Sequence, residues 1–315
     1  MKKLRSNKVS AVLTAVSVCS FISAAVMLKP LDSYGVNISN DHLVLQVQDN
    51  AEESGYGAYQ LFRNTGSSQE AITYAQFFSS FAQISVNGNV CLFSEGETVR
   101  ELYSTDNSVV TVKNFGGVEI TQTLSFAQGN TIKNDMLKIE YSAVNKNEDN
   151  AMLTVRAVID PTIADSESDA IIVGKAEYQE ETSFTGDSIP KDWYIHDDKG
   201  NISAYGIVSD SGAAPDRFDI ADWENLYNSR FSYSPSEMIS DNAAAVTWTD
   251  RTLTSGETLI CSTKYGLYSE DPNEKPAAGN SPKTGDTAGY LFAAAGVVSM
   301  TAAVLTRKRR SDENE

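Results

Sequence analysis

The sequence predicts an all-β fold, an antiparallel β-sandwich, in the central part of the chain, with a signal segment before it and a single transmembrane helix after it. Three observations support this fold class. Short runs alternate between apolar and polar residues, turn-forming Asn, Asp and Gly separate the runs, and long stretches with helical periodicity are missing from the central part. Alternation with a period of two is typical of antiparallel sheets that bury one face. We therefore expect strands with one face in the core and the other in solvent.

The chain begins with the parts of a secretory signal. A basic leader within the first eight residues is followed by an apolar run from Val9 to Leu28. Ser23-Ala24-Ala25 offers a cleavage site with small residues at its outer positions. We predict that residues 1–35 are a signal peptide. The apolar run is also long enough for the alternative, a retained membrane anchor.

The central part, residues 36–268, contains the runs that we expect to form strands. They are 41–48, 118–126, 136–145, 151–160, 243–250 and 257–267. The step Asn87-Gly88 predicts a tight hairpin turn, and residues 219–231 are suited to one short helix. The sequence leaves open whether the strands build one sandwich or two smaller subdomains.

Charge and cysteine content restrict the partners and the chemistry. The formal net charge is −17, and so acidic a chain repels nucleic acid, which excludes it as an expected partner. Cys19 lies in the N-terminal apolar run. Cys91 and Cys261 lie in strand-like runs, where they either form one disulfide or remain buried thiols.

Two groups of residues are candidates for binding. Flat aromatic rings in loop-like segments can stack on sugars, and the candidates of this kind are Trp193, Trp223 and Tyr227; Trp248, on an alternating strand, is expected in the core. Acidic residues after the strand 151–160 could converge on a calcium ion, and they are Asp160, Asp165, Glu167 and Asp169. The alternative for this acidic loop is a solvated surface, and we predict no other cofactor.

We predict no catalytic residues. His42 and His196 are far apart in the sequence, and no nucleophile elbow accompanies them. His196 lies in a polar turn, where general acid–base chemistry is the alternative to a surface role. A cluster of His196 with Arg217 and carboxylates in an open groove would favour an enzyme, whereas a shallow aromatic surface without convergent acids would favour binding.

The C-terminal part of the chain has four segments. Residues 269–280 are polar and proline-containing, which predicts a flexible linker. Residues 281–286 begin with the pentapeptide Ser281-Pro282-Lys283-Thr284-Gly285. We expect residues 287–306 to form a transmembrane segment, because no charged residue interrupts it, and 307–315 to be a cytoplasmic basic tail.

The pentapeptide, the apolar span and the basic tail together resemble the sorting signal that Gram-positive sortases read. Its common form is LPxTG, and Ser281 stands here in place of Leu. The resemblance implies that a sortase cysteine attacks the carbonyl of Thr284, releases the chain from Gly285 onward, and joins Thr284 to an amine of the peptidoglycan cross-bridge. The five residues are then a substrate and not a catalytic site, and the protein is expected on the cell wall surface of a Gram-positive bacterium.

The central part resembles a module of bacterial surface proteins similar to the supersandwich of galactose mutarotases and polysaccharide lyases. The resemblance rests on the strand succession 118–163, on "APDRFDIADWENLY" and on the closing "DNAAAVTWTDRTLTSGETLICSTKYGLY". It implies a supersandwich-like ectodomain, and fold alone leaves its activity open. We expect a non-enzymatic module for binding a glycan or host-surface ligand, or for a structural role. The alternative is an extracellular carbohydrate-active enzyme.

Overall fold

The computed structural model describes residues 35–50, 55–129, 131, 133–163, 170–196, 202–235 and 238–268. The predicted linker, sorting motif, transmembrane segment and basic tail lie outside these residues, as does the predicted signal peptide apart from its last residue. In the described part of the chain, no helix is both long and apolar enough to cross a membrane.

The described strands form three antiparallel sheets. The four-stranded sheet has the order β1 (Val36–Ser39), β2 (Leu43–Val47), β3 (Tyr59–Asn64), β4 (Gln69–Ala71). The six-stranded sheet has the order β14 (Thr182–Thr185), β17 (Arg217–Asp222), β18 (Asn242–Leu253), β11 (Ala151–Ile159), β5 (Phe81–Val86), β6 (Asn89–Leu92). The nine-stranded sheet has the order β13 (Ala176–Tyr178), β12 (Ile171–Val173), β15 (Asp192–His196), β16 (Ile202–Ile207), β19 (Thr258–Leu267), β10 (Met136–Asn145), β9 (Val118–Ala127), β8 (Ser108–Phe115), β7 (Glu97–Ser104).

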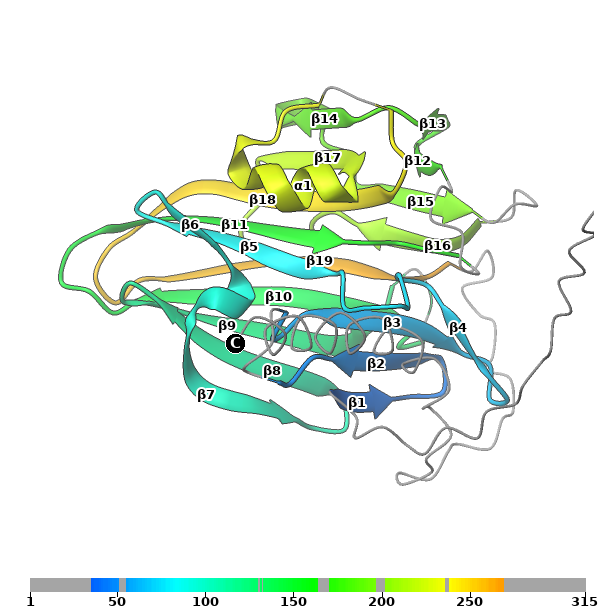
Figure 1. Ribbon diagram of the computed structural model, residues 1–315, viewed down its shortest axis with the longest axis horizontal. Coiled ribbons are helices and arrows are strands. Elements are labelled where there is room, and N and C mark those ends of the chain that lie inside the picture. The colour runs from blue at the N-terminus through cyan, green and yellow to red at the C-terminus, as the bar shows by residue number, and fades with distance from the viewer. Residues whose placement is uncertain are drawn as a thin grey trace, which may run out of the picture.

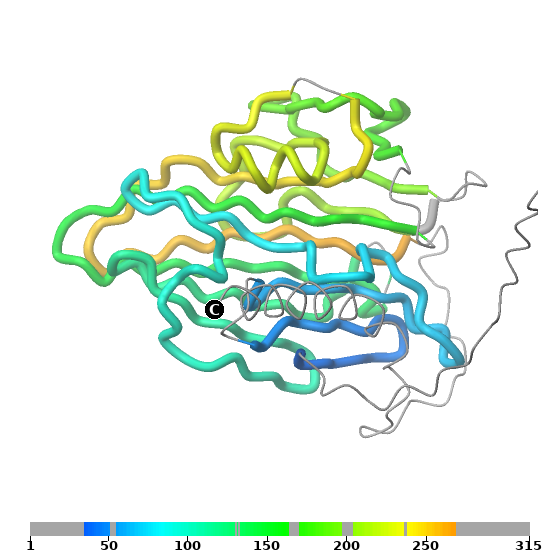
Figure 2. The backbone as a smooth tube through the Cα atoms, viewed as in Figure 1, coloured from blue at the N-terminus to red at the C-terminus, as the bar shows by residue number. Residues whose placement is uncertain are grey.

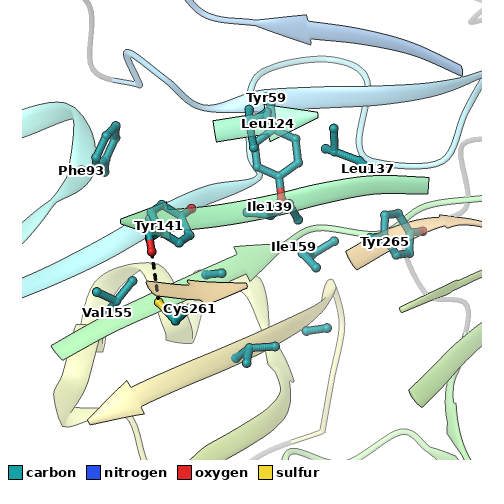
Figure 3. Packing of buried hydrophobic residues seen from close by; sticks show 14 of the residues in the cluster. Tyr59, Phe93, Leu124, Leu137, Ile139, Tyr141, Val155, Ile159, Cys261 and Tyr265 are labelled. Atoms are coloured by element: carbon teal, nitrogen blue, oxygen red, sulfur yellow. Dashed lines mark hydrogen bonds between the residues drawn. The ribbon is translucent and has the colours of Figure 1, made fainter. Parts of the chain in front are cut away.

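The four- and six-stranded sheets lie in front of the nine-stranded sheet (Figure 1, Figure 2). Two isolated bridges, Tyr59–Ser80 and Thr73–Pro161, connect the two front sheets at their seam. One apolar cluster takes side chains from all three sheets, including Tyr59 of β3, Ile139 of β10 and Val155 of β11 (Figure 3). The all-β antiparallel sandwich predicted from the sequence is confirmed.

The strands of the two layers bury their faces differently. In β9 and β10 buried residues alternate with half-buried ones, as the period-two pattern predicted. β11 is buried along almost its whole length, because its outer face is covered as well. The helix α1 (Trp223–Ser229) covers it: Leu226 packs there with Val158 of β11 and Ala245 of β18.

The hairpin turn and the short helix that the sequence predicted are both formed. Asn87 and Gly88 connect β5 to β6 with positive φ values of 52° and 84°, which a tight hairpin turn of this kind requires. The short helix expected within 219–231 is α1, and Asp222 caps its N-terminus by accepting a hydrogen bond from the backbone N–H of Glu224. Two single-turn helices follow nearby elements: η1 (Phe93–Glu95) comes directly after β6, and η3 (Arg230–Ser232) comes directly after α1.

Candidate ligand-binding groove

A half-open groove lies beside α1 on the outer side of the front layer, where the four- and six-stranded sheets meet. Its volume is about 280 Å³. The wall on one side is α1, and η1 and the turn 55–58 form the other side. The residues that line it are Gly55, Tyr56, Gly57, Ala58, Phe77, Phe78, Phe81, Ala82, Leu92, Phe93, Ser94, Trp223 and Tyr227.

The predicted aromatic candidates Trp223 and Tyr227 lie together in this groove. They are four residues apart, so α1 places them on the same face. Their rings are stacked, with centroids 5.0 Å apart and an interplanar angle of 11°. Both side chains are half-buried. The pair therefore presents an aromatic wall that remains partly open to solvent.

The position of the indole is fixed from several sides. Its Nε1–H donates to the carbonyl oxygen of Ser79 at 2.9 Å. Phe77 and Phe81 meet the Trp223 ring edge-on, at centroid distances of 6.1 and 5.9 Å. Since edge-to-face packing is a favourable arrangement of aromatic pairs, the groove wall is preorganised.

None of the lining residues carries a charged side chain. Lys113 contacts the lining residue Tyr56, with its Nζ 4.4 Å from the centre of the Tyr56 ring. Lys113 is buried and donates to the carbonyl oxygens of Ser94 and Gly96 and to Oγ1 of Thr98. Burial lowers the pKa of Lys113 and raises the pKa of Tyr56. The groove thus offers apolar surface with a few neutral polar groups.

Four phenylalanines line the groove, Phe77, Phe78, Phe81 and Phe93, and none of them was a candidate from the sequence. Phe77, Phe78 and Phe81 lie in the stretch "AQFFSSFAQ" that leads into β5. Phe77 is 52% exposed, which is unusual for so large an apolar side chain. The sequence feature that could have revealed the first three is the high density of aromatic residues just before a strand, in a segment without apolar periodicity.

Trp193 does not belong to the groove, and its assignment as a ligand platform is corrected. It is fully buried in β15 of the nine-stranded sheet. Its ring stacks on Tyr265 with centroids 5.2 Å apart and an interplanar angle of 10°. A ring enclosed in this way has no face available to a sugar. Trp248 is fully buried, as expected.

The structure describes only one of the four predicted calcium ligands. Asp160 directly follows β11 and is buried, whereas Asp165, Glu167 and Asp169 lie outside the described residues. Within the described ranges, no three His, Cys, Asp or Glu side chains are grouped to hold a metal ion. The calcium site stays a prediction.

His196 and Arg217 are not brought together. His196 ends β15, and its Nε2 lies 3.4 Å from a carboxylate oxygen of Glu177. Arg217 belongs to β17 in the six-stranded sheet, where its Nε lies 2.6 Å from Oδ1 of Asp219. His42 immediately precedes β2. The arrangement that would have favoured an enzyme is not formed by these residues.

Cys91 and Cys261 are both free thiols. Cys91 is half-buried in β6 and Cys261 is buried in β19, so they belong to different sheets. The sequence left open whether the two cysteines form a disulfide or remain thiols, and in the structure they are unpaired thiols.

The C-terminal part of the sequence decides the location of the protein. Residues 282–314 match the LPXTG cell wall anchor motif. This is an extracellular surface protein anchored to the cell wall. The match begins at Pro282, directly after Ser281, the position at which the sequence departs from the common motif. Such an anchor implies processing by a sortase and covalent attachment to peptidoglycan, in agreement with the sequence analysis.

Several solved structures resemble the surface protein in outline. A galactose mutarotase related enzyme from Lactobacillus acidophilus is 8% identical, with a TM-score of 0.40, and the match covers 76% of this chain and 99% of that one. A galactose mutarotase-like protein from Lactobacillus casei is 9% identical, with a TM-score of 0.45 and coverages of 74% and 100%. A heparan sulfate lyase from Pedobacter heparinus is 9% identical, with a TM-score of 0.41 and coverages of 78% and 36%.

These likenesses agree with the predicted resemblance to galactose-mutarotase-like β-sandwiches. At TM-scores below 0.5 and identities below 10% they carry no argument for an activity. No relative was found among curated protein sequences.

Proposed function

We propose that this wall-anchored protein displays its sandwich as a non-enzymatic binding module, and that the groove beside α1 takes an uncharged glycan. We also propose that the sortase cleaves between Thr284 and Gly285 and joins Thr284 to a cross-bridge amine. The observation that carries the first proposal is the stacked pair Trp223–Tyr227 in a half-open, uncharged groove.

The chemistry of the groove suits a sugar. The apolar C–H face of a pyranose packs against an aromatic ring, and the hydroxyl of Tyr227 supplies a polar group at the edge. The volume of about 280 Å³ lies just below the range of about 300–1,000 Å³ that is typical of small-molecule sites. A charged sugar would lose hydration without gaining a counter-ion from the lining residues, which favours a neutral one.

A binding role fits the lining better than catalysis. General acid–base chemistry at neutral pH requires a group such as a histidine or a carboxylate within hydrogen-bonding distance of the substrate. The lining residues include no histidine, carboxylate or amine. The proposed module therefore holds its ligand without transforming it.

Glycan binding to the protein released from the cell wall tests the proposal. We expect binding to neutral oligosaccharides on a glycan array and by calorimetry. Trp223→Ala and Tyr227→Ala should each weaken it by at least about tenfold, equivalent to about 1.4 kcal/mol, because the stacking surface is lost.

The matched control is Tyr194→Ala. Tyr194 is also half-buried and stacked, on Tyr205 of the nine-stranded sheet, with centroids 5.8 Å apart. Its replacement should leave glycan affinity unchanged. Equal affinity of the Trp223→Ala and wild-type proteins, or the lack of any glycan ligand, would reject the groove as a sugar site.

A further inference from the structure

The two walls of the groove come from distant parts of the chain and are joined at one end. Tyr227 belongs to α1, and Ser94 on the opposite wall belongs to η1. Arg230 is the residue after α1, and Glu95 is the last residue of η1. Nη1 of Arg230 lies 3.3 Å from Oε2 of Glu95. An ion pair thus connects the wall that carries the stacked rings to the wall that faces them.

The backbone of Arg230 is held in an unusual conformation. Its φ of 52° and ψ of −133° lie in a region that favours glycine and costs energy for other residues. The buried Arg156 of β11 stabilises this conformation, because its Nη1 donates to the carbonyl oxygen of Arg230 at 2.7 Å. Arg156 is itself fixed by Thr247 Oγ1, to which its Nε donates at 3.0 Å. The sheet therefore anchors the end of α1 from below, while the Arg230 side chain extends to η1.

Glu95 has a second contact that fixes its direction. Its Oε2 accepts a hydrogen bond from the backbone N–H of Leu92 at 2.7 Å, within the wall formed by η1. The two side chains of the pair are still accessible, with exposed fractions of 49% for Glu95 and 28% for Arg230. An exposed pair of this kind is weak and is screened by dissolved salt.

We propose that Glu95 and Arg230 form a salt-sensitive clasp that holds α1 against η1 and limits access to the groove. When the pair separates, the Arg230 side chain is released from η1, while Arg156 still holds the end of α1 on the sheet, and the aromatic wall becomes more accessible. Access of a neutral molecule to the groove then depends on ionic strength, although neither the molecule nor the lining of the groove carries a charge. The glycan as ligand rests on the proposed function, but the clasp itself is testable without a ligand.

Tryptophan fluorescence reports on the groove directly. The chain has three tryptophans: Trp193 and Trp248 are fully buried, and the half-buried Trp223 lines the groove. Acrylamide, a small uncharged quencher, should therefore act mainly on Trp223. We expect its quenching constant in the wild-type protein to rise by about 1.5-fold or more between 20 mM and 1 M NaCl, since salt at about 1 M screens charges beyond roughly 3 Å.

Two variants remove the clasp in different ways. Glu95→Gln keeps an oxygen that can accept from Leu92 but loses the charge, and Arg230→Gln loses the cation. Both should show the high-salt quenching constant at every salt concentration. Arg230→Lys retains a cation and should restore part of the salt dependence. Equal urea unfolding midpoints would show that the variants remain folded.

The control is Glu70→Gln, which removes another exposed ion pair, Arg63–Glu70 at 3.6 Å, away from the groove. It should leave quenching and its salt dependence as in the wild type. Quenching that is independent of salt in the wild type, or Glu95→Gln quenching equal to that of the wild type at 20 mM NaCl, would overturn the clasp. Because acrylamide replaces the sugar, a failure of glycan binding leaves this result unaffected, and the two proposals fail separately.

Discussion

Trp193 packs flat against Gly206 of the neighbouring strand β16, its partner in the sheet register. A methyl group at position 206 would overlap the indole ring. Gly206→Ala should therefore lower the free energy of unfolding by about 1–3 kcal/mol, the usual cost of overpacking. Urea unfolding measures this change. In a Trp193→Leu background the cost of the same substitution should shrink, because the overlapping ring is gone.

Cys261 is expected to be an inert thiol in the folded protein. Burial raises its pKa to about 12, and its Sγ points to the carbonyl oxygen of Tyr141 in the core (Figure 3). Thiolate is the reactive form, so labelling with a thiol reagent at pH 8 should be negligible until the protein unfolds. Because the chain has three cysteines, a variant with both Cys19→Ser and Cys91→Ser isolates this thiol. Rapid labelling of that variant at the rate of a free peptide would contradict the packing.

The candidate site was predictable only in part at the level of residues. Trp223 and Tyr227 were both candidates from the sequence, and the structure adds that α1 places them on one face and in one groove. Trp193 was misjudged because Asp192 and the acidic residues after His196 suggest a polar loop. The alternation of Trp193 and Ile195, both buried in β15, was the signal for a strand.

At the scale of elements, α1 has a side-chain cap at its N-terminus. Asp222 accepts from the backbone N–H of Glu224 through Oδ1, and its Oδ2 accepts from the backbone and the hydroxyl of Ser240. Burial opposes its ionisation, but these hydrogen bonds outweigh burial and lower the pKa of Asp222. The carboxylate therefore connects the helix to the segment before β18.

Asp222→Ala should cost about 1–2 kcal/mol of unfolding free energy at pH 7, in the upper range for the loss of an N-cap. Because the pKa of Asp222 is lower in the folded than in the unfolded protein, the advantage of the carboxylate is complete at neutral pH and is lost as the pH falls through that pKa. The difference from the wild type should thus be smaller at pH 3. Asp222→Asn, which keeps a capping oxygen, is the control. An equal loss in both variants would argue against the cap.

The six runs expected from the alternation form β2, β9, β10, β11, β18 and β19, with ends within three residues of those expected. Most of the other described strands, and the burial of the second faces, were not predicted. β9 and β10 alternate in sequence and in burial. β11 contains Arg156 at a position that becomes buried under the segment after α1, where it bonds to the backbone of Arg230. A charged residue in an otherwise apolar run gives no indication of such a partner 74 residues away.

At the scale of the whole molecule, the arrangement of the sheets could not be predicted from the sequence. β19 pairs with both β10 and β16, and β11 pairs with β5 and β18. These contacts join strands that are distant in the chain, and each strand pattern is compatible with many partners. Alternation decides which face is buried, whereas the order of strands depends on packing throughout the sandwich.

The wall anchor yields a prediction for the complete precursor. In the proposed mechanism the sortase attacks the carbonyl of residue 284. Thr284→Ala keeps that carbonyl but removes the Thr side chain of the recognised motif, so it should reduce transfer to the cross-bridge and leave the protein in the membrane fraction. Ser281→Leu, which restores the common motif, should maintain or raise the anchored fraction. Mass spectrometry of wall fragments released by muramidase is the measurement. Wild-type peptides that continue past Gly285 would contradict the proposed cleavage position.

The position of β19 has a mechanical consequence for a protein tethered at its C-terminal side. Traction from the wall reaches the folded part through Tyr268, directly after β19, and acts along that strand. β19 lies inside the nine-stranded sheet, with register partners from Met136 to Val144 on β10 and from Ala204 to Ile207 on β16. Pulling along the strand loads the hydrogen bonds to β10 and β16 in shear. Many of these bonds must then break together and cannot open one after another from one end. The sandwich is thus built to withstand drag at the tether.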